Sequence, residues 1–121
     1  MSTPQKRLFH LFIPAFLLST GLLGLLSPTT LASLFQMPVA PSTHAAGFVQ
    51  CMGGRNLTFG LISAVFVRRG DWGAAATMAG FLAVDGVVDG WVAWGYAGFG
   101  AAVPHFLAAA GVPFLAVWMA E

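Results

Sequence analysis

The chain has 121 residues, of which 58% are hydrophobic and only 7% are charged, and its formal net charge is +1. Soluble domains carry about 25% charged residues, so this composition excludes a fold with a complete polar shell and requires lipid around much of the surface. The small net charge gives no reason to expect a nucleic-acid partner. Cys51 is the only cysteine, which excludes an intrachain disulfide and a zinc site built from cysteines.

Four apolar segments are candidates for membrane spans, since about 20 mostly apolar residues cross a hydrocarbon core of about 30 Å. The predicted spans are residues 8–26, 48–67, 72–94 and 105–120. The proline-rich segment 27–47 is predicted to be a loop outside the core, with a short interfacial helix at LASLFQM. The glycine-rich segment 96–103 is predicted to be a turn that places Pro104 first in the last helix. We therefore expect an all-α fold, a four-helix transmembrane bundle in one membrane domain over residues 1–121, with the lipid bilayer as its partner.

The basic residues predict the orientation of this bundle. Lys6 and Arg7 precede the first predicted span, Arg68 and Arg69 separate the second from the third, and segments 27–47 and 96–103 contain no lysine or arginine. Lysine and arginine concentrate in cytoplasmic loops, so we expect both termini in the cytoplasm. A cleaved signal peptide ending near residue 32, and hence a secreted soluble protein, is the alternative. It is disfavoured because an apolar run over residues 8–26 exceeds the roughly 7–15 residues of a signal sequence.

Three ionisable residues fall inside the predicted spans: Arg55, Asp85 and Asp89. At a rise of about 1.5 Å per residue, Arg55 and Asp85 reach the same depth on antiparallel helices, and Asp89 lies one turn nearer the outer surface. Each charge that faced lipid would cost roughly 2.5–3.5 kcal/mol. We therefore expect both charged faces to point inward and Arg55 to pair with Asp85, which leaves Asp89 as a surplus carboxylate.

Two interpretations of these charges stay open. In the first, they line a polar cavity open to the outer side, with Arg55, Asp85 and Asp89 as catalytic residues and with Asn56 and His105 as substrate-binding residues. In the second, Arg55 and Asp85 are only an interhelical pair that fixes the register of two helices. The sequence contains no ligand spacing that indicates a metal and no motif that indicates a cofactor.

Other residues predict packing and membrane position. Gly53, Gly54 and Gly60 indicate a close approach of the second helix to a neighbour, because small residues allow backbones to pack in lipid. Trp91, Trp94 and Tyr96 are predicted to belong to an aromatic belt at the outer interface. Val92 and Tyr96 also lie on or near the helix face of Asp85 and Asp89.

The run Gly53-Gly54-Arg55-Asn56-Leu57-Thr58-Phe59-Gly60, followed by Asp85-Gly86-Val87-Val88-Asp89-Gly90, carries a resemblance to a family. Over roughly residues 8–120 the chain resembles an uncharacterised family of small four-span membrane proteins of fungi and bacteria, a domain of unknown function that is distantly DoxX-like. The resemblance implies a four-span fold with an arginine in the second helix and aspartates in the third, and it implies no assigned activity.

These observations lead to two hypotheses for function. One is an enzyme that performs acid–base chemistry, such as isomerisation, cyclisation or cofactor-free oxidation, on a lipophilic small molecule of secondary metabolism. Small four-span proteins that act on lipophilic intermediates in fungal metabolite clusters favour it by architecture only. The other is a non-catalytic membrane subunit or scaffold. A homo-oligomer is compatible with both hypotheses.

Overall fold

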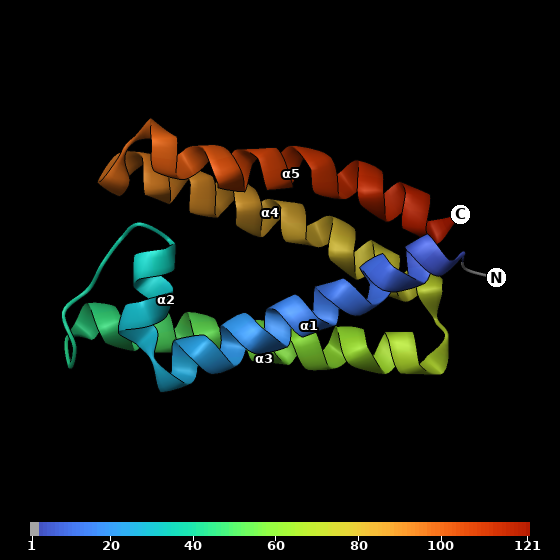
Figure 1. Cartoon of the computed structure of the whole chain (residues 1–121), viewed down its shortest axis with the longest axis horizontal. Coiled ribbons are helices and arrows are strands. Elements are labelled where there is room, and N and C mark those ends of the chain that lie inside the picture. The colour runs from blue at the N-terminus through green and yellow to red at the C-terminus, as the bar shows by residue number, and fades with distance from the viewer. Residues whose placement is uncertain (1–2) are drawn as a thin grey trace.

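The computed structural model describes residues 3–121, and these fold entirely into helices and their connections. Figure 1 shows the five helices in chain order. The helices are α1 (Pro4–Leu26), α2 (Pro28–Leu34), α3 (His44–Arg69), α4 (Trp72–Ala97) and α5 (Phe99–Ala120). The all-α prediction is confirmed, and the four long helices correspond to the four predicted segments.

Side chains and a glycine define the ends of the long helices. The Thr43 hydroxyl accepts a hydrogen bond from the Ala46 amide at the start of α3, at 3.2 Å. Gly70 ends α3 in the left-handed region, with a φ of 71° that glycine adopts without a steric penalty. The Asp71 carboxylate then accepts a hydrogen bond from the Ala74 amide at 3.1 Å and caps α4. The connection between α3 and α4 is therefore a tight turn, and the two helices run antiparallel (Figure 1).

The long helices form two closely packed pairs. In the α1–α3 pair, an added Cβ at Gly21 would lie 2.6 Å from the Leu57 backbone nitrogen, and one at Gly53 would lie 2.8 Å from the Gly21 carbonyl oxygen. In the α4–α5 pair, an added Cβ at Gly90 would lie 2.5 Å from the ring of Phe106. The glycines thus let the backbones of α1 and α3 pack directly on each other and let the Phe106 ring of α5 pack on the backbone of α4. Close packing of this kind is typical of helices that associate in lipid.

The structure confirms the predicted close approach at Gly53 and Gly60 and corrects it at Gly54. An added Cβ at Gly60 would lie 2.9 Å from the Leu18 backbone nitrogen, whereas none at Gly54 would meet an atom within 4 Å. Successive residues on a helix point about 100° apart. The face that packs on α1 therefore includes Gly53 and excludes its neighbour.

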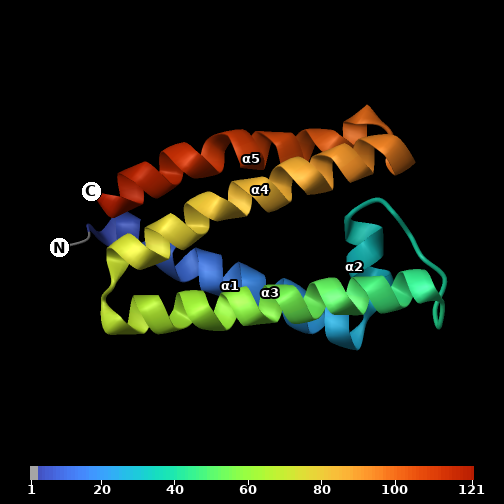
Figure 2. The same ribbon diagram turned by 180° about the vertical axis from the view of Figure 1, so that it is seen from behind.

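The two helix pairs meet at the end of the molecule that holds both termini (Figure 1). His10 of α1 is fully buried there, with its ring centroid 4.9 Å from that of Trp72 at the start of α4. Its Nε2 atom is 3.4 Å from the Met119 carbonyl oxygen near the end of α5. Figure 2, seen from behind, shows α2 at the opposite end of the molecule, between α3 and the far end of α4 and α5. One imidazole therefore joins α1, α4 and α5 at the terminal end.

Three of the helices, α1, α4 and α5, are long and apolar enough to cross a membrane, which identifies a multi-pass membrane protein. They contain the predicted spans 8–26, 72–94 and 105–120. With 26 residues α3 has the required length, but it does not belong to this set. Polar Gln50, Arg55 and Asn56 lower its hydropathy, so the four-span prediction is not confirmed by composition.

The structure also corrects two predicted connections. The glycine-rich turn is reduced to Gly98, whose φ of 91° reverses the chain, and α5 begins at Phe99 instead of residue 105. Pro104 consequently lies inside α5, five residues after its first residue. In the segment 27–47, the predicted short helix is α2, which begins at Pro28 and packs against the bundle through the buried Leu31 and Ala32. The connection is also shorter than predicted, because α3 begins at His44.

Candidate functional site

Arg55 of α3 and Asp85 of α4 form a salt bridge that connects the two helix pairs. The distance between Arg55 Nη1 and Asp85 Oδ1 is 3.6 Å, with 44% and 31% of the respective side chains exposed. The predicted match in depth and direction on these antiparallel helices is confirmed. The two helix pairs also meet at His10, at the terminal end of the molecule. The salt bridge lies away from that contact and joins α3 to α4, two helices that otherwise touch little.

Asp89 lies one helical turn beyond Asp85, about 6 Å further from the terminal end. It interacts electrostatically with Arg55, Asp85 and His105. In the described part of the chain, Arg55–Asp85 is the salt bridge that forms, and Asp89 takes part in neither a salt bridge nor a hydrogen bond. Arg55 pairs directly with Asp85, so Asp89 is the carboxylate of the two that has no direct partner among the described residues.

A cavity of about 720 Å³ lies beside Asp89, between α4, α3 and the segment that includes α2. This volume is in the range of pockets that hold drug-sized ligands. Most of the lining is apolar, and Asp89 is the lining residue that carries a formal charge. The lining residues are Ala32, Phe35, Gln36, Met37, Pro38, Val39, Ala45, Phe48, Val49, Met52, Asp89, Val92 and Tyr96.

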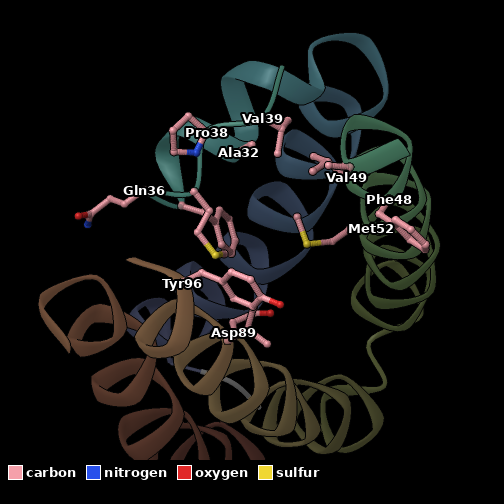
Figure 3. Close-up of a pocket in the computed structure, with 13 residues that line it drawn as sticks. Ala32, Gln36, Pro38, Val39, Phe48, Val49, Met52, Asp89 and Tyr96 are labelled. Carbon is pink, nitrogen blue, oxygen red and sulfur yellow. The ribbon is translucent and has the colours of Figure 1, made fainter. Parts of the chain in front are cut away.

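Figure 3 shows how the labelled side chains lie around this cavity. Asp89 and Tyr96 come from α4, and Met52 extends toward them from α3. Gln36 lines the cavity with its stem, while its amide points away (Figure 3). Asp89 and the Tyr96 phenol are therefore the polar side-chain groups that an occupant of this cavity would meet.

The segment after α2 closes one side of the cavity. Met37 packs on a buried cluster of Ala93, Ala101 and Ala102 from α4 and α5, so the segment is anchored on the second helix pair. Gln36 and Ser42 both have a φ of 59°, a left-handed backbone that residues other than glycine seldom adopt. These two bends carry the chain from α2 across the cavity to α3.

The other predicted substrate-binding residues do not line the cavity. His105 of α5 stacks on Phe35, with ring centroids 5.0 Å apart and an interplanar angle of 37°, so Phe35 lies in contact with both the cavity and the imidazole. Asn56 donates a hydrogen bond from Nδ2 to the Thr20 hydroxyl of α1 at 3.1 Å. Its amide therefore joins α1 to α3, which is a structural contact.

The inward-facing stripe of α4 is longer than the two aspartates. Side chains that are three or four residues apart in a helix share a face. Val92 and Tyr96 therefore continue the face of Asp85 and Asp89 into the cavity lining. The sequence placed Tyr96 near the face of the two aspartates, seven residues after Asp89, but assigned its ring to an aromatic belt and not to a ligand site. The cavity residues of the segment 35–39 were not predicted.

Comparisons with known proteins supply a family but no activity. Neither the curated proteins nor the solved structures contain a match to this chain. A protein-family model matches residues 15–119, a region that contains the salt bridge, Asp89 and the residues of the cavity lining. The chain therefore belongs to the family described as Domain of unknown function (DUF4267).

Proposed function

We propose that this membrane protein binds a lipophilic small molecule in the cavity beside Asp89 and exchanges a proton with it. The observation that carries the proposal is a carboxylate that lies at the wall of a mostly apolar cavity and has no hydrogen bond or salt bridge among the described residues. Ionisable groups inside membrane segments are costly and mark functional sites by default. A carboxyl group in such surroundings is suited to act as a general acid or base.

The proposal divides the three charges into two roles. Asp89 is the acid–base group, because it alone of the five predicted site residues lines the cavity. Arg55 and Asp85 are positioning residues that hold α3 and α4 at a fixed spacing one turn below Asp89. Proton exchange of this kind is the chemistry that an isomerisation or a cyclisation of a lipophilic molecule requires.

The same proposal includes a membrane arrangement. We place α3 as a fourth span, because it is antiparallel to α4 and as long as that candidate span. Its charge at Arg55 is compensated by Asp85. Lys6, Arg7, Arg68 and Arg69 then lie on the cytoplasmic side together with both termini. The cavity and the segment 27–43 lie toward the other side of the bilayer.

A second candidate function is that of a non-catalytic subunit or scaffold. Two contacts favour it: the Arg55–Asp85 salt bridge and the Asn56–Thr20 hydrogen bond both join helices and have no need of a ligand. This candidate leaves the cavity and the free Asp89 carboxylate without a role, so we rank it second.

Deletion of the gene in its native host, followed by untargeted profiling of lipophilic metabolites, tests the enzymatic proposal. We expect a precursor to accumulate in the deletion strain and equally in a strain carrying Asp89→Asn. Met52→Trp, which fills the cavity from α3, should have the same effect. Asp71→Asn is the matched control, because it removes one carboxylate outside the cavity and asparagine also caps helices well.

The charge exchange Arg55→Asp with Asp85→Arg separates the two roles. If these residues only position the helices, the exchanged variant retains at least part of the wild-type metabolite profile, while Asp89→Asn does not. A wild-type profile in the Asp89→Asn strain, with normal protein abundance, would reject the enzymatic proposal in favour of the scaffold.

A further inference from the structure

The formal charges of Arg55, Asp85 and Asp89 beside the cavity do not sum to zero. This excess of one carboxylate indicates the chemical class of the occupant. The cluster contains one arginine and two aspartates, and Arg55 is engaged with Asp85. The lining has no lysine or arginine among residues 3–121. An occupied cavity that excludes water therefore leaves Asp89 either protonated and neutral, or ionised beside a positive charge that the occupant brings.

His105, the basic side chain of α5, interacts electrostatically with Asp89 but does not contact it directly. The His105 imidazole faces the ring of Phe35 and forms no salt bridge with Asp89 within 4.0 Å in the described structure. Phe35 both lines the cavity and stacks on the imidazole, whereas His105 itself is not a lining residue.

The remaining lining suits the apolar part of a cation. Phe35, Phe48 and Tyr96 supply aromatic rings, whose faces attract cations, and Val49, Met52 and Val92 supply aliphatic surface. A fatty acid of the same size would bring a second carboxylate near Asp89, which the low dielectric of a membrane cavity makes unfavourable. A neutral alcohol would leave Asp89 without a counterion, so the carboxyl group would have to take up a proton to become neutral.

We infer that the occupant of this cavity is a lipophilic amine, with its protonated nitrogen against Asp89 and its apolar part among the aromatic and aliphatic side chains. The inference rests on the function proposed for the cavity and narrows its ligand to one class. The proton exchange then has a defined course: an N–H bond of the ammonium group breaks and an O–H bond forms on Asp89. A cation and a carboxylate become a neutral amine and a carboxylic acid, and the reverse step restores both charges.

A binding experiment with three probes of one chain length tests the inference. The full chain is reconstituted in nanodiscs of phosphatidylcholine, and the binding of dodecylammonium, dodecanol and dodecanoate is measured by equilibrium dialysis against empty nanodiscs. We expect the ammonium probe to bind about tenfold or more tightly than the alcohol, because charge-assisted contacts exceed neutral ones by roughly that factor. The carboxylate probe should bind most weakly.

Three variants make the result specific to Asp89. Asp89→Asn should remove the preference for the ammonium probe, and Asp89→Glu, which retains the charge, should keep most of it. Asp71→Asn makes the same change of charge outside the cavity and should bind as the wild type does. Thermal unfolding of each variant in the nanodiscs verifies that the fold is intact.

The results separate two questions: whether the cavity binds a lipophilic molecule, and whether that molecule is an amine. Equal binding of the three probes, or an ammonium preference that survives Asp89→Asn, would overturn the amine as the ligand class and leave the cavity as a site for neutral lipophilic molecules. Binding of no probe above that of empty nanodiscs would overturn both the amine and the proposed occupation of the cavity.

Discussion

Arg55 and Asp85 approach to 3.6 Å across the two helix pairs, and one turn further along α4 Asp89 has neither a hydrogen bond nor a salt bridge within residues 3–121. The two aspartates share a helix face. They nevertheless differ in their surroundings, because Asp85 forms the salt bridge with Arg55 and Asp89 lines the cavity.

The salt bridge should contribute to stability as a coupled pair. Arg55→Gln or Asp85→Asn alone leaves one unpaired charge between the helices, and we expect each to lower the free energy of unfolding by about 1–2 kcal/mol. The double variant should lose less than the sum of the two, by about 1 kcal/mol. A double-mutant cycle from equilibrium unfolding in mixed micelles measures this coupling. Arg69→Gln, an exposed change at the end of α3, serves as the control, and strictly additive losses would contradict the coupling.

Asn56 should act through Thr20 and not through a ligand. Asn56→Leu removes the interhelical hydrogen bond, and we expect a loss of roughly 0.6–1.7 kcal/mol in the free energy of unfolding, the range for such bonds in membranes. Thr20→Val should cause a similar loss that does not add to the first. In the probe-binding experiment, Asn56→Leu should retain the wild-type preference for the ammonium probe. A preference lost with the fold intact would return Asn56 to the ligand site, as the sequence predicted.

Gly53 and Gly54 should differ sharply in their tolerance of a methyl group. Gly53→Ala places a Cβ 2.8 Å from the Gly21 carbonyl oxygen, and overpacking of this kind is expected to destabilise by about 1–3 kcal/mol. Gly54→Ala meets no atom within 4 Å and should be neutral or slightly stabilising, since alanine favours helix. Thermal unfolding of the two variants in one detergent provides the comparison. Equal midpoints would show that α1 and α3 pack less closely than the structure describes.

The proposed fourth span makes the two ends of α3 accessible from opposite sides of the membrane. In a Cys51→Ala background, Ser42→Cys and Arg69→Cys place single thiols just before α3 and at its end, both at exposed positions. A membrane-impermeant maleimide added to sealed vesicles should label one variant from outside and the other only after permeabilisation. Labelling of both from the same side would reject a spanning α3 and the proposed orientation with it.

Much of the fold follows from composition and periodicity. The apolar segments around residues 8–26, 72–94 and 105–120 specify candidate spans because the length of an apolar helix and the thickness of a bilayer are fixed quantities. The spacing of Asp85 and Asp89 specifies a shared face, and the rise per residue specifies that Arg55 reaches the depth of Asp85. These are local or one-dimensional relations, so the sequence by itself determined the pairing of Arg55 with an aspartate of α4.

The cavity was decided only by the tertiary structure. It depends on how α2 turns inward after Ser27, on the left-handed bends at Gln36 and Ser42, and on the packing of Met37 against α4 and α5. These contacts join residues far apart in the chain, and no periodic pattern encodes them. The same is true of Asn56, whose partner Thr20 was set by the angle at which α1 crosses α3. The sequence determined which charges fall within the long helices, and the three-dimensional arrangement of the helix pairs decided that Asp85 is paired and Asp89 faces the cavity.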